Sequence, residues 1–194
     1  MSPRTKEQFE QMRTDRKEAI MDAALHVFAE EGYHSASISK VSKAAGVSKG
    51  LMYNYFESKE ELLKALLHTI LHKEGQFVRD LVKRGLTDET FKELIHHTRD
   101  LLKEDPKHWK LYFHMAIQPE VLAIILEDHQ GDRAELTMQF VTYFEAKYPG
   151  DGMRKLHYFN SVFSGVKMNF IMDTVNYPLD DMCELVIEQF VNGN

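Results

Sequence analysis

Cysteine is almost absent from this chain of 194 residues, and long apolar runs are missing. Cys183 is the only cysteine, so no intramolecular disulfide can form, which favours a reducing, cytoplasmic setting. The longest apolar runs, such as residues 121–126, are far shorter than the ~20 residues of a membrane-spanning helix. Residues 1–13 are polar and lack the apolar centre of a secretion signal. The sequence therefore predicts a protein without disulfides, membrane spans or signal peptide.

Acidic residues are absent from one stretch of an acidic protein. The net charge is −6, yet residues 1–60 hold nine basic and nine acidic residues, so the remainder carries all of it. Between Glu31 and Glu57 there is no acid, while Lys40, Lys43 and Lys49 lie inside this stretch. A local positive patch of this kind predicts phosphate binding at one end of the molecule.

Strand alternation is also missing, whereas helical periodicity runs through nearly the whole chain, which predicts an all-α fold. A first helix is expected from Thr14 or Asp15, with a capping box formed by Asp15 and Glu18, to Gly32. Further helices are expected over 38–45, 49–56 and onward from Ser58. The predicted organisation is a flexible arm over 1–13, a three-helix DNA-binding domain over 14–60, and a helical ligand-binding and dimerisation domain over 61–194.

Residues 38–56, ISKVSKAAGVSKGLMYNYF, have the pattern of a helix-turn-helix. Two small alanines precede Gly46, which permits a tight turn, and Ser48 can cap the second helix. Met52 and Phe56 are four residues apart and are predicted to face inward. The opposite face then carries Lys49, Gly50, Tyr53 and Asn54, which predicts a surface for DNA bases and phosphates.

These residues bear a family resemblance. Residues 28–63, with AAGVSKG, the segment YNYF and SKEELL, resemble the DNA-binding domain of the TetR family of regulators. The resemblance implies an all-α homodimer that represses transcription at a palindromic double-stranded operator and leaves it when a small-molecule effector binds. It places family DNA contacts on Lys49, Gly50, Tyr53, Tyr55 and Lys59, with Leu51 and Asn54 at positions that vary. The predicted DNA contacts are Ser37, Ser39, Lys49, Gly50, Leu51, Tyr53, Asn54, Tyr55 and Lys59.

Aromatic residues at helical spacing fill the rest of the chain and are typical of a core. A pocket between such helices, with a few polar groups, is also a common ligand site, which predicts an apolar or aromatic effector. The candidates for effector binding are Phe77, Trp109, Tyr112, Phe113, Phe140, Tyr143, Phe144, Tyr158 and Phe163.

The expected helix over 152–174 is apolar on two faces, so one of them needs a second partner. Together with a stripe on the last helix, this pattern predicts a four-helix interface between two copies, as the resemblance also implies. The predicted interface residues are Ser161, Gly165, Met168, Met172, Leu179, Met182, Val186 and Phe190.

Three other interpretations stay open. Residues 46–50 match the G-x-S-x-G elbow of hydrolases, but that elbow needs a preceding strand. The pairs His68/His72 and His96/His97 lack a third ligand, so neither a metal nor another cofactor is predicted. Arg4, Lys6 and Arg13 form a basic arm for the minor groove or a disordered terminus.

The alternative functions are an activator or ligand-independent regulator of the same fold, and a helical small-molecule carrier or enzyme.

Overall fold

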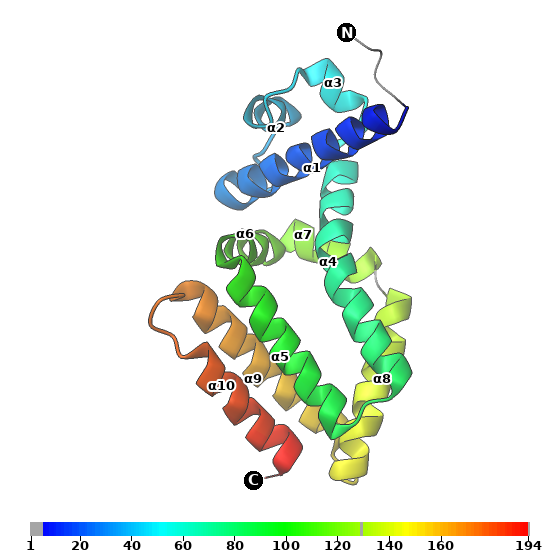
Figure 1. Ribbon diagram of the computed structural model, residues 1–194, viewed down its shortest axis with the longest axis vertical. Helices are drawn as coiled ribbons and strands as arrows, with labels where there is room; N and C mark the ends of the chain where they lie inside the picture. Colours follow the sequence, from blue (N-terminus) through cyan, green and yellow to red (C-terminus); the bar gives the residue numbers. More distant parts are fainter. Residues whose placement is uncertain (1–5, 129, 194) are drawn as a thin grey trace. The chain divides into compact units, whose positions relative to one another are not determined.

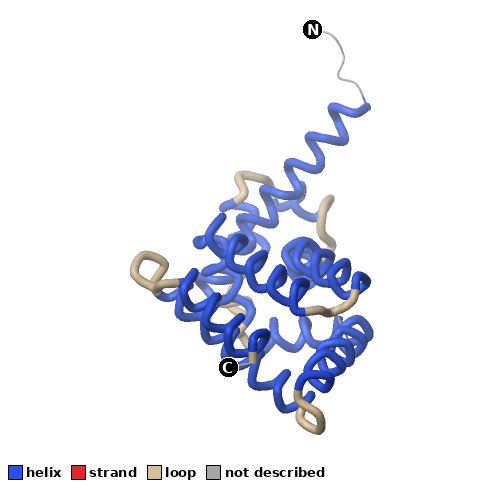
Figure 2. The backbone as a smooth tube through the Cα atoms, turned by 60° about the horizontal axis from the view of Figure 1, so that its bottom comes forward, coloured by secondary structure: helices blue, strands red, loops and turns tan. Residues whose placement is uncertain are grey.

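The computed structural model describes residues 6–128 and 130–193, and these residues form helices joined by short loops, with no strand among them (Figures 1 and 2). The predicted all-α fold is therefore confirmed. The chain divides into two compact units. The first contains residues 1–72 and 111–127, and the second contains residues 73–110 and 128–194. In the described part of the chain, no helix combines the length and the apolar character needed to cross a membrane.

The first unit is built on α1 (Lys6–Glu31), α2 (Ile38–Ala44), α3 (Lys49–Tyr53) and the first half of α4 (Lys59–Arg84). It also includes the end of α6 (Pro106–Ala116) and nearly all of α7 (Pro119–Asp128). Ala24, Phe28, Val41 and Met52 are completely buried in it. The long helix α4 passes without a break from one unit into the other.

The start of α1 differs from the prediction. The helix begins at Lys6 rather than near Thr14, so residues 6–13 are helical instead of a flexible arm, and Asp15 and Glu18 form no capping box. Side-chain pairs one turn apart stabilise this segment, because Lys6 lies 4.0 Å from Glu10 and Gln11 donates to Asp15 at 2.7 Å. Arg4 lies outside the described residues.

Serine caps set the short helices. Ser37 accepts a hydrogen bond from Lys40 N at the start of α2, and Ser48 accepts one from Leu51 N at the start of α3. At the start of α4, Ser58 accepts from Glu61 N, and the Glu61 carboxylate accepts from Glu57 N. Ser58 and Glu61 therefore both cap α4, and the Glu61 carboxylate bonds the residue before the N-cap. Helix α3 ends at Tyr53, three residues earlier than expected.

The second unit contains the rest of α4, α5 (Asp88–Glu104), the start of α6, α8 (Gln130–Lys147), α9 (Gly152–Met172), α10 (Leu179–Ile187) and a π-helical turn (Glu188–Asn192). Helix α8 packs along α9, and α10 packs against both α5 and α9. Phe91 of α5 is completely buried at the centre, with ring centroids 4.8 Å from Tyr143 and Phe159 and 5.5 Å from Phe144. Cys183 is buried in the apolar stripe of α10, and burial raises its pKa to about 11.

Candidate nucleic-acid interface

A tight turn joins α2 to α3. Gly46 has a φ of +64°, a conformation that favours glycine, and Val47 N donates to Ser42 O at 2.9 Å. Behind the turn, Met52 is 0% exposed and Phe56 is 1% exposed. The prediction that these two side chains face inward is confirmed. The helix-turn-helix geometry follows from the small residues at the crossing and the glycine in the turn.

The opposite face of α3 is open to solvent. Lys49, Gly50 and Asn54 are exposed, and the exposed fractions of Leu51 and Tyr53 are 37% and 46%. A Cβ atom added to Gly50 would meet no other atom within 4 Å, and its φ is ordinary, so nothing within the protein requires glycine there. This exposed set, Lys49, Gly50, Leu51, Tyr53 and Asn54, is called the α3 face below.

The serines near α3 have different roles. The hydroxyls of Ser37 and Ser48 accept backbone N–H groups as helix caps, whereas Ser39 is exposed beside them on α2. A helix, not a strand, precedes Ser48, so the hydrolase elbow is not formed. Ser48 serves as the cap that the helix-turn-helix interpretation predicts.

The ammonium group of Lys59 is engaged by the protein itself. Its ammonium group donates to the carbonyl oxygens of Tyr33, His34 and Ala36 at 2.8, 3.1 and 3.0 Å, and it lies 4.5 Å from the centroid of the Tyr33 ring. A lysine ammonium has three N–H donors, so all of them are used. In this structure three converging carbonyls of the loop between α1 and α2 engage the ammonium group of Lys59, so the DNA contact stays a prediction that would have to replace these hydrogen bonds.

Lys40 is also occupied. It pairs with Glu31 at the end of α1, whereas Lys43 at the end of α2 is exposed. The acid-free stretch therefore presents Lys43 and Lys49 as its exposed basic groups that no described acid pairs with.

Gln118, between α6 and α7, is a residue that sequence analysis missed. Its amide oxygen accepts from Tyr33 N at 2.6 Å, and its amide nitrogen donates to Phe28 O at 3.0 Å. It thereby satisfies backbone groups left open where α1 ends. These contacts span 85 and 90 residues, so no local pattern could have indicated them.

The histidines form no metal site in the described part of the chain, where no group of three metal-binding side chains comes together. His96 hydrogen-bonds Glu184 at 3.0 Å, and His97 stacks on Phe77 at 3.6 Å between ring centroids. Burial lowers the pKa of His97. The side chain of His72 lies outside the described residues.

The predicted effector residues are divided between the two units. Tyr112 and Phe113 belong to the first unit, and the other candidates belong to the second. Phe144 of α8 and Phe163 of α9 are buried in the aromatic core, where Phe144 packs on Phe91 and Phe163 stacks on Phe159, and their role in effector binding stays a prediction. The ring centroid of Phe140 lies 6.0 Å from that of Phe91, at the edge of that core. Tyr158 is 46% exposed, and Trp109 is buried and donates to Leu101 O.

Tyr143 lines a surface hollow of about 410 Å³ together with other residues of α8 and Leu86. Its hydroxyl donates to Asp88 at 2.9 Å, and Lys147 contacts the same carboxylate at 2.6 Å. The hydrogen bond from Lys147 lowers the pKa of Asp88, and burial raises the pKa of Tyr143. Tyr143 therefore stays a neutral donor at the wall of this hollow. The residues that line it are Leu86, Gln139, Thr142, Tyr143, Ala146 and Lys147.

The predicted dimer residues separate into two groups. Leu179, Val186 and Phe190 are at most 4% exposed within the protomer, so their placement in an interface is wrong. Their stripe on α10 faces α5 and α9 instead. The remaining predicted residues, Ser161, Gly165, Met168, Met172 and Met182, lie at or near the surface. Met172, Val175 and Leu185 are 75%, 87% and 52% exposed. Val175 and Leu185 were not among the predicted interface residues.

Known proteins resemble this chain in the region of the helix-turn-helix. The profile of bacterial regulatory proteins of the tetR family matches residues 20–66. The fatty acid metabolism regulator protein of Bacillus subtilis is 42% identical over 74 residues, 38% of this chain and 37% of that protein. The transcriptional activator FasR of Mycolicibacterium smegmatis is 30% identical over 115 residues, 57% of this chain and 52% of that protein. The chain therefore spans about a third to a half of these two relatives.

The solved structures extend the similarity beyond the helix-turn-helix. The regulator FadR from Bacillus subtilis, solved in complex with stearoyl-CoA, aligns with a TM-score of 0.68 and 26% identity. The alignment covers 91% of this chain and 98% of that one. The turn at Gly46, the buried Met52 and Phe56 and the exposed α3 face thus occur in a chain whose fold also matches such a regulator. On these grounds residues 20–66 belong to the tetR family of bacterial regulatory proteins, and the chain as a whole shares the fold of a solved regulator.

Proposed function

We propose that this chain is a sequence-specific, DNA-binding transcriptional regulator that acts as a homodimer in the cytoplasm and leaves its operator when a fatty acyl-CoA binds. The α3 face carries the DNA-binding part of the proposal. It combines exposed hydrogen-bonding side chains with a glycine that packing does not require. A short helix of this kind enters the major groove, where side chains such as lysine and asparagine read base edges.

A homodimer would present two α3 faces. Two-fold dimers of this class bind half-sites one helical turn apart, about 34–36 Å, which makes the operator palindromic. Exposed apolar side chains next to one another on the surface mark association sites. Met172, Leu185 and the half-buried Met182 supply such groups on α9 and α10, and Gly165 leaves open space for a close neighbour.

The effector class rests on the relatives. A relative of this chain is a fatty acid metabolism regulator, and a structural neighbour was solved with stearoyl-CoA. An acyl chain is apolar. It therefore agrees with the apolar or aromatic effector that the sequence analysis predicts from the aromatic residues after the DNA-binding region. The hollow beside Tyr143 offers an apolar wall with polar groups at Gln139, Thr142 and Lys147.

Selection of DNA by the intact protein tests the first part. The full-length protein is incubated with a pool of random duplexes, and the bound fraction is sequenced after several rounds. We expect one enriched palindrome, called the selected duplex below. If the bound fraction stays random in sequence at physiological salt, the proposed sequence-specific function is wrong.

Stearoyl-CoA is expected to weaken binding to the selected duplex by about 5- to 150-fold, the usual range of allosteric coupling. Linkage requires the selected duplex to weaken stearoyl-CoA binding by the same factor. Fluorescence anisotropy of labelled DNA and calorimetric titration with stearoyl-CoA measure the two sides of this cycle. Free CoA and stearate serve as controls and should leave the affinity for DNA unchanged. If stearoyl-CoA binds without altering the affinity for DNA, the effector assignment fails.

Gly50→Ala should have opposite effects on stability and DNA binding. Alanine in place of a helical glycine stabilises the fold by about 0.5–1 kcal/mol. The added methyl group projects from the α3 face and should weaken binding to the selected duplex by about tenfold, because it blocks close approach to the groove. Gly75→Ala on α4 is the control, since its Cβ meets only the flexible guanidinium of Arg79. If Gly50→Ala binds DNA as tightly as the wild type, the α3 face does not approach the duplex closely.

An activator is the second candidate, because the 30% identical relative from Mycolicibacterium smegmatis is an activator. Both functions use the same α3 face and differ in the position of the operator relative to the promoter. Transcript levels beside the selected site, compared between a deletion strain and its parent, decide between them. A rise on deletion indicates a repressor and a fall indicates an activator.

A further inference from the structure

The first part of α1, residues 6–19, is helical although none of its residues is buried. All residues from Lys6 to Ala19 are exposed, and Ile20 is the first buried residue of the helix. Helices of globular proteins gain most of their stability by packing an apolar face, and this segment has none against its own unit. Its charges, however, are not scattered at random.

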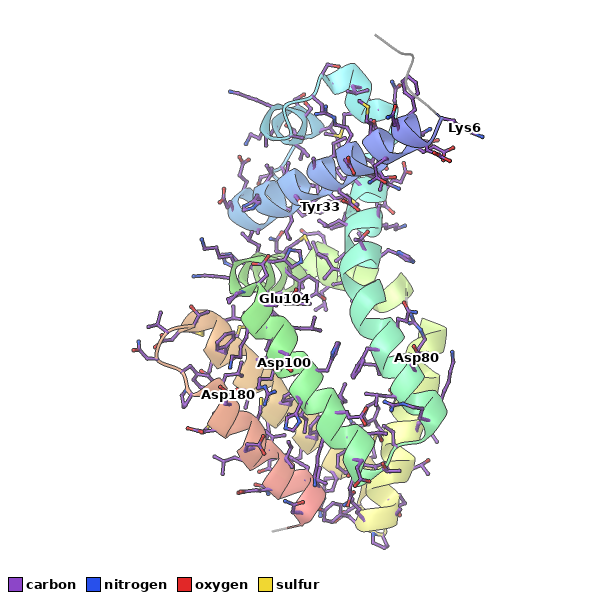
Figure 3. The ribbon with its side chains drawn as sticks, viewed as in Figure 1. Lys6, Tyr33, Asp80, Asp100, Glu104 and Asp180 are labelled. Atoms are coloured by element: carbon purple, nitrogen blue, oxygen red, sulfur yellow. The ribbon has the colours of Figure 1, made fainter. Side chains whose placement is uncertain are left out.

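Except for Glu10, the charges of this segment separate onto two faces. At about 100° per residue, Arg13 and Lys17 continue the stripe that becomes buried at Ile20 and Ala24. The opposite face is acidic. Lys6 lies on the basic face at the N-terminal end of the described helix (Figure 3), where it pairs with Glu10 at 4.0 Å. The acidic face consists of Glu7, Asp15, Glu18 and Asp22.

The basic face lies beside the end of the helix-turn-helix. The Arg13 guanidinium carbon is 5.9 Å from the centroid of the Tyr55 ring, and Lys17 Nζ is 5.5 Å from that of Phe56. These rings follow α3 directly in the chain. Within the described residues, neither cation forms a salt bridge. Arg13 and Lys17, called the α1 pair below, therefore add positive charge next to the α3 face.

We infer that the α1 pair binds phosphates of the duplex that flank the groove entered by α3. The inference rests on the proposed DNA-binding function. Four residues of helix advance by about 6 Å, so the two cations contact separate phosphates. Contacts of this kind fix the position of the protein on the duplex without reading its sequence. A helical segment that starts at Lys6 holds them in place before DNA binds, which lowers the entropy lost on binding.

An acidic protein partner or an anionic membrane surface would also attract two cations. The structure favours DNA because Arg13 lies beside Tyr55, which directly follows Asn54 of the α3 face, and Lys17 lies one turn further along the same side of α1. The acidic opposite face would repel an anionic surface that surrounded the helix, whereas a duplex touches the helix from one side only.

The test replaces both cations in the full-length protein, Arg13→Gln with Lys17→Gln, since glutamine keeps helix propensity and removes the charge. The dissociation constant is measured against salt concentration with the selected duplex and with a random duplex. The slope of log K against log salt is negative, and each lost phosphate contact reduces its magnitude by about 0.9. We therefore expect the magnitude to fall by about 1.8 for each protomer bound. Affinity for both duplexes should fall by the same factor.

Lys83→Gln with Arg154→Gln is the matched control. These exposed cations belong to the second unit and pair with Asp80 and Asp151, and their loss changes the net charge by the same amount. The control should leave the slope unchanged. The exchange Arg13→Lys with Lys17→Arg keeps both charges and should keep the slope.

The outcomes separate this inference from the proposed function. An unchanged slope in the Arg13→Gln, Lys17→Gln variant overturns the inference, and so does a loss limited to the selected duplex, which would indicate base reading. A wild-type protein that binds neither duplex overturns the proposed function itself. A variant that keeps the slope but loses binding to acidic vesicles or to an acidic protein also overturns the assignment to DNA.

Discussion

Replacing Lys49 and Tyr53 together by alanine is expected to weaken binding to the selected duplex by about 30-fold or more, with the fold intact. Both side chains are exposed on α3, and Tyr53 is 46% exposed, so neither contributes to the core. A lost contact to a base or a phosphate costs about 1–3 kcal/mol, and two of them therefore cost about 2–6 kcal/mol. Surface substitutions outside such contacts change stability by about 0.5 kcal/mol at most.

Fluorescence anisotropy with the selected duplex measures this loss, and thermal denaturation checks the fold. Tyr53→Phe isolates the hydroxyl group, because it keeps the ring. Lys83→Ala on α4 is a control for the loss of one exposed lysine. Stearoyl-CoA should still stabilise the double variant against heat, since the variant changes only the α3 face. Wild-type affinity in the double variant would mean that another surface binds DNA.

Lys59→Met is expected to lower the free energy of unfolding by about 1–3 kcal/mol, because methionine keeps the length of the side chain and removes the ammonium group. The carbonyls of Tyr33, His34 and Ala36 would lose a shared charged donor. Since Lys59 is half-buried, water replaces part of that interaction, which keeps the cost below that of a fully buried group. For a chain of this length, each kcal/mol lowers Tm by about 2–4 °C.

The salt dependence of DNA binding distinguishes this role from a phosphate contact. If Lys59 only holds the loop between α1 and α2, Lys59→Met lowers Tm and leaves the salt slope unchanged. A phosphate contact would instead give an unchanged Tm and a slope lower by about 0.9 per protomer bound. Lys43→Met is the control, because Lys43 is exposed and no described acid pairs with it. Stability of this control should stay within about 0.5 kcal/mol of the wild type.

Local chemistry explains why the helix-turn-helix could be predicted. Ser48 caps α3 through an N–H group three residues away, and Gly46 provides the one turn conformation that other residues rarely adopt. The four-residue spacing of Met52 and Phe56 decides which face is buried. All these interactions join residues close together in the sequence, so the pattern of residue types is sufficient to identify them.

Contacts between distant segments explain the differences from the predictions. The lysine at position 59 looks like a phosphate ligand, but the loop over 33–36 places three carbonyls around it. The stripe with Leu179, Val186 and Phe190 is equally suitable for a partner chain and for the protomer's own core, and packing against α5 and α9 decides for the core. Gln118 carries no local signal, because its partners precede it by 85 and 90 residues.

The all-α fold, the helix-turn-helix and the outward face of α3 follow from caps, turns and helical periodicity, which act over a few residues and can therefore be recognised in the sequence. Which cations remain free of protein partners depends instead on the folded chain. Lys40 and Lys59 are engaged by Glu31 and by loop carbonyls, whereas Arg13 and Lys17 lie beside Tyr55 and Phe56. The physical reason is that the availability of a charged group depends on the groups that folding brings to it, and these come from segments far away in the chain.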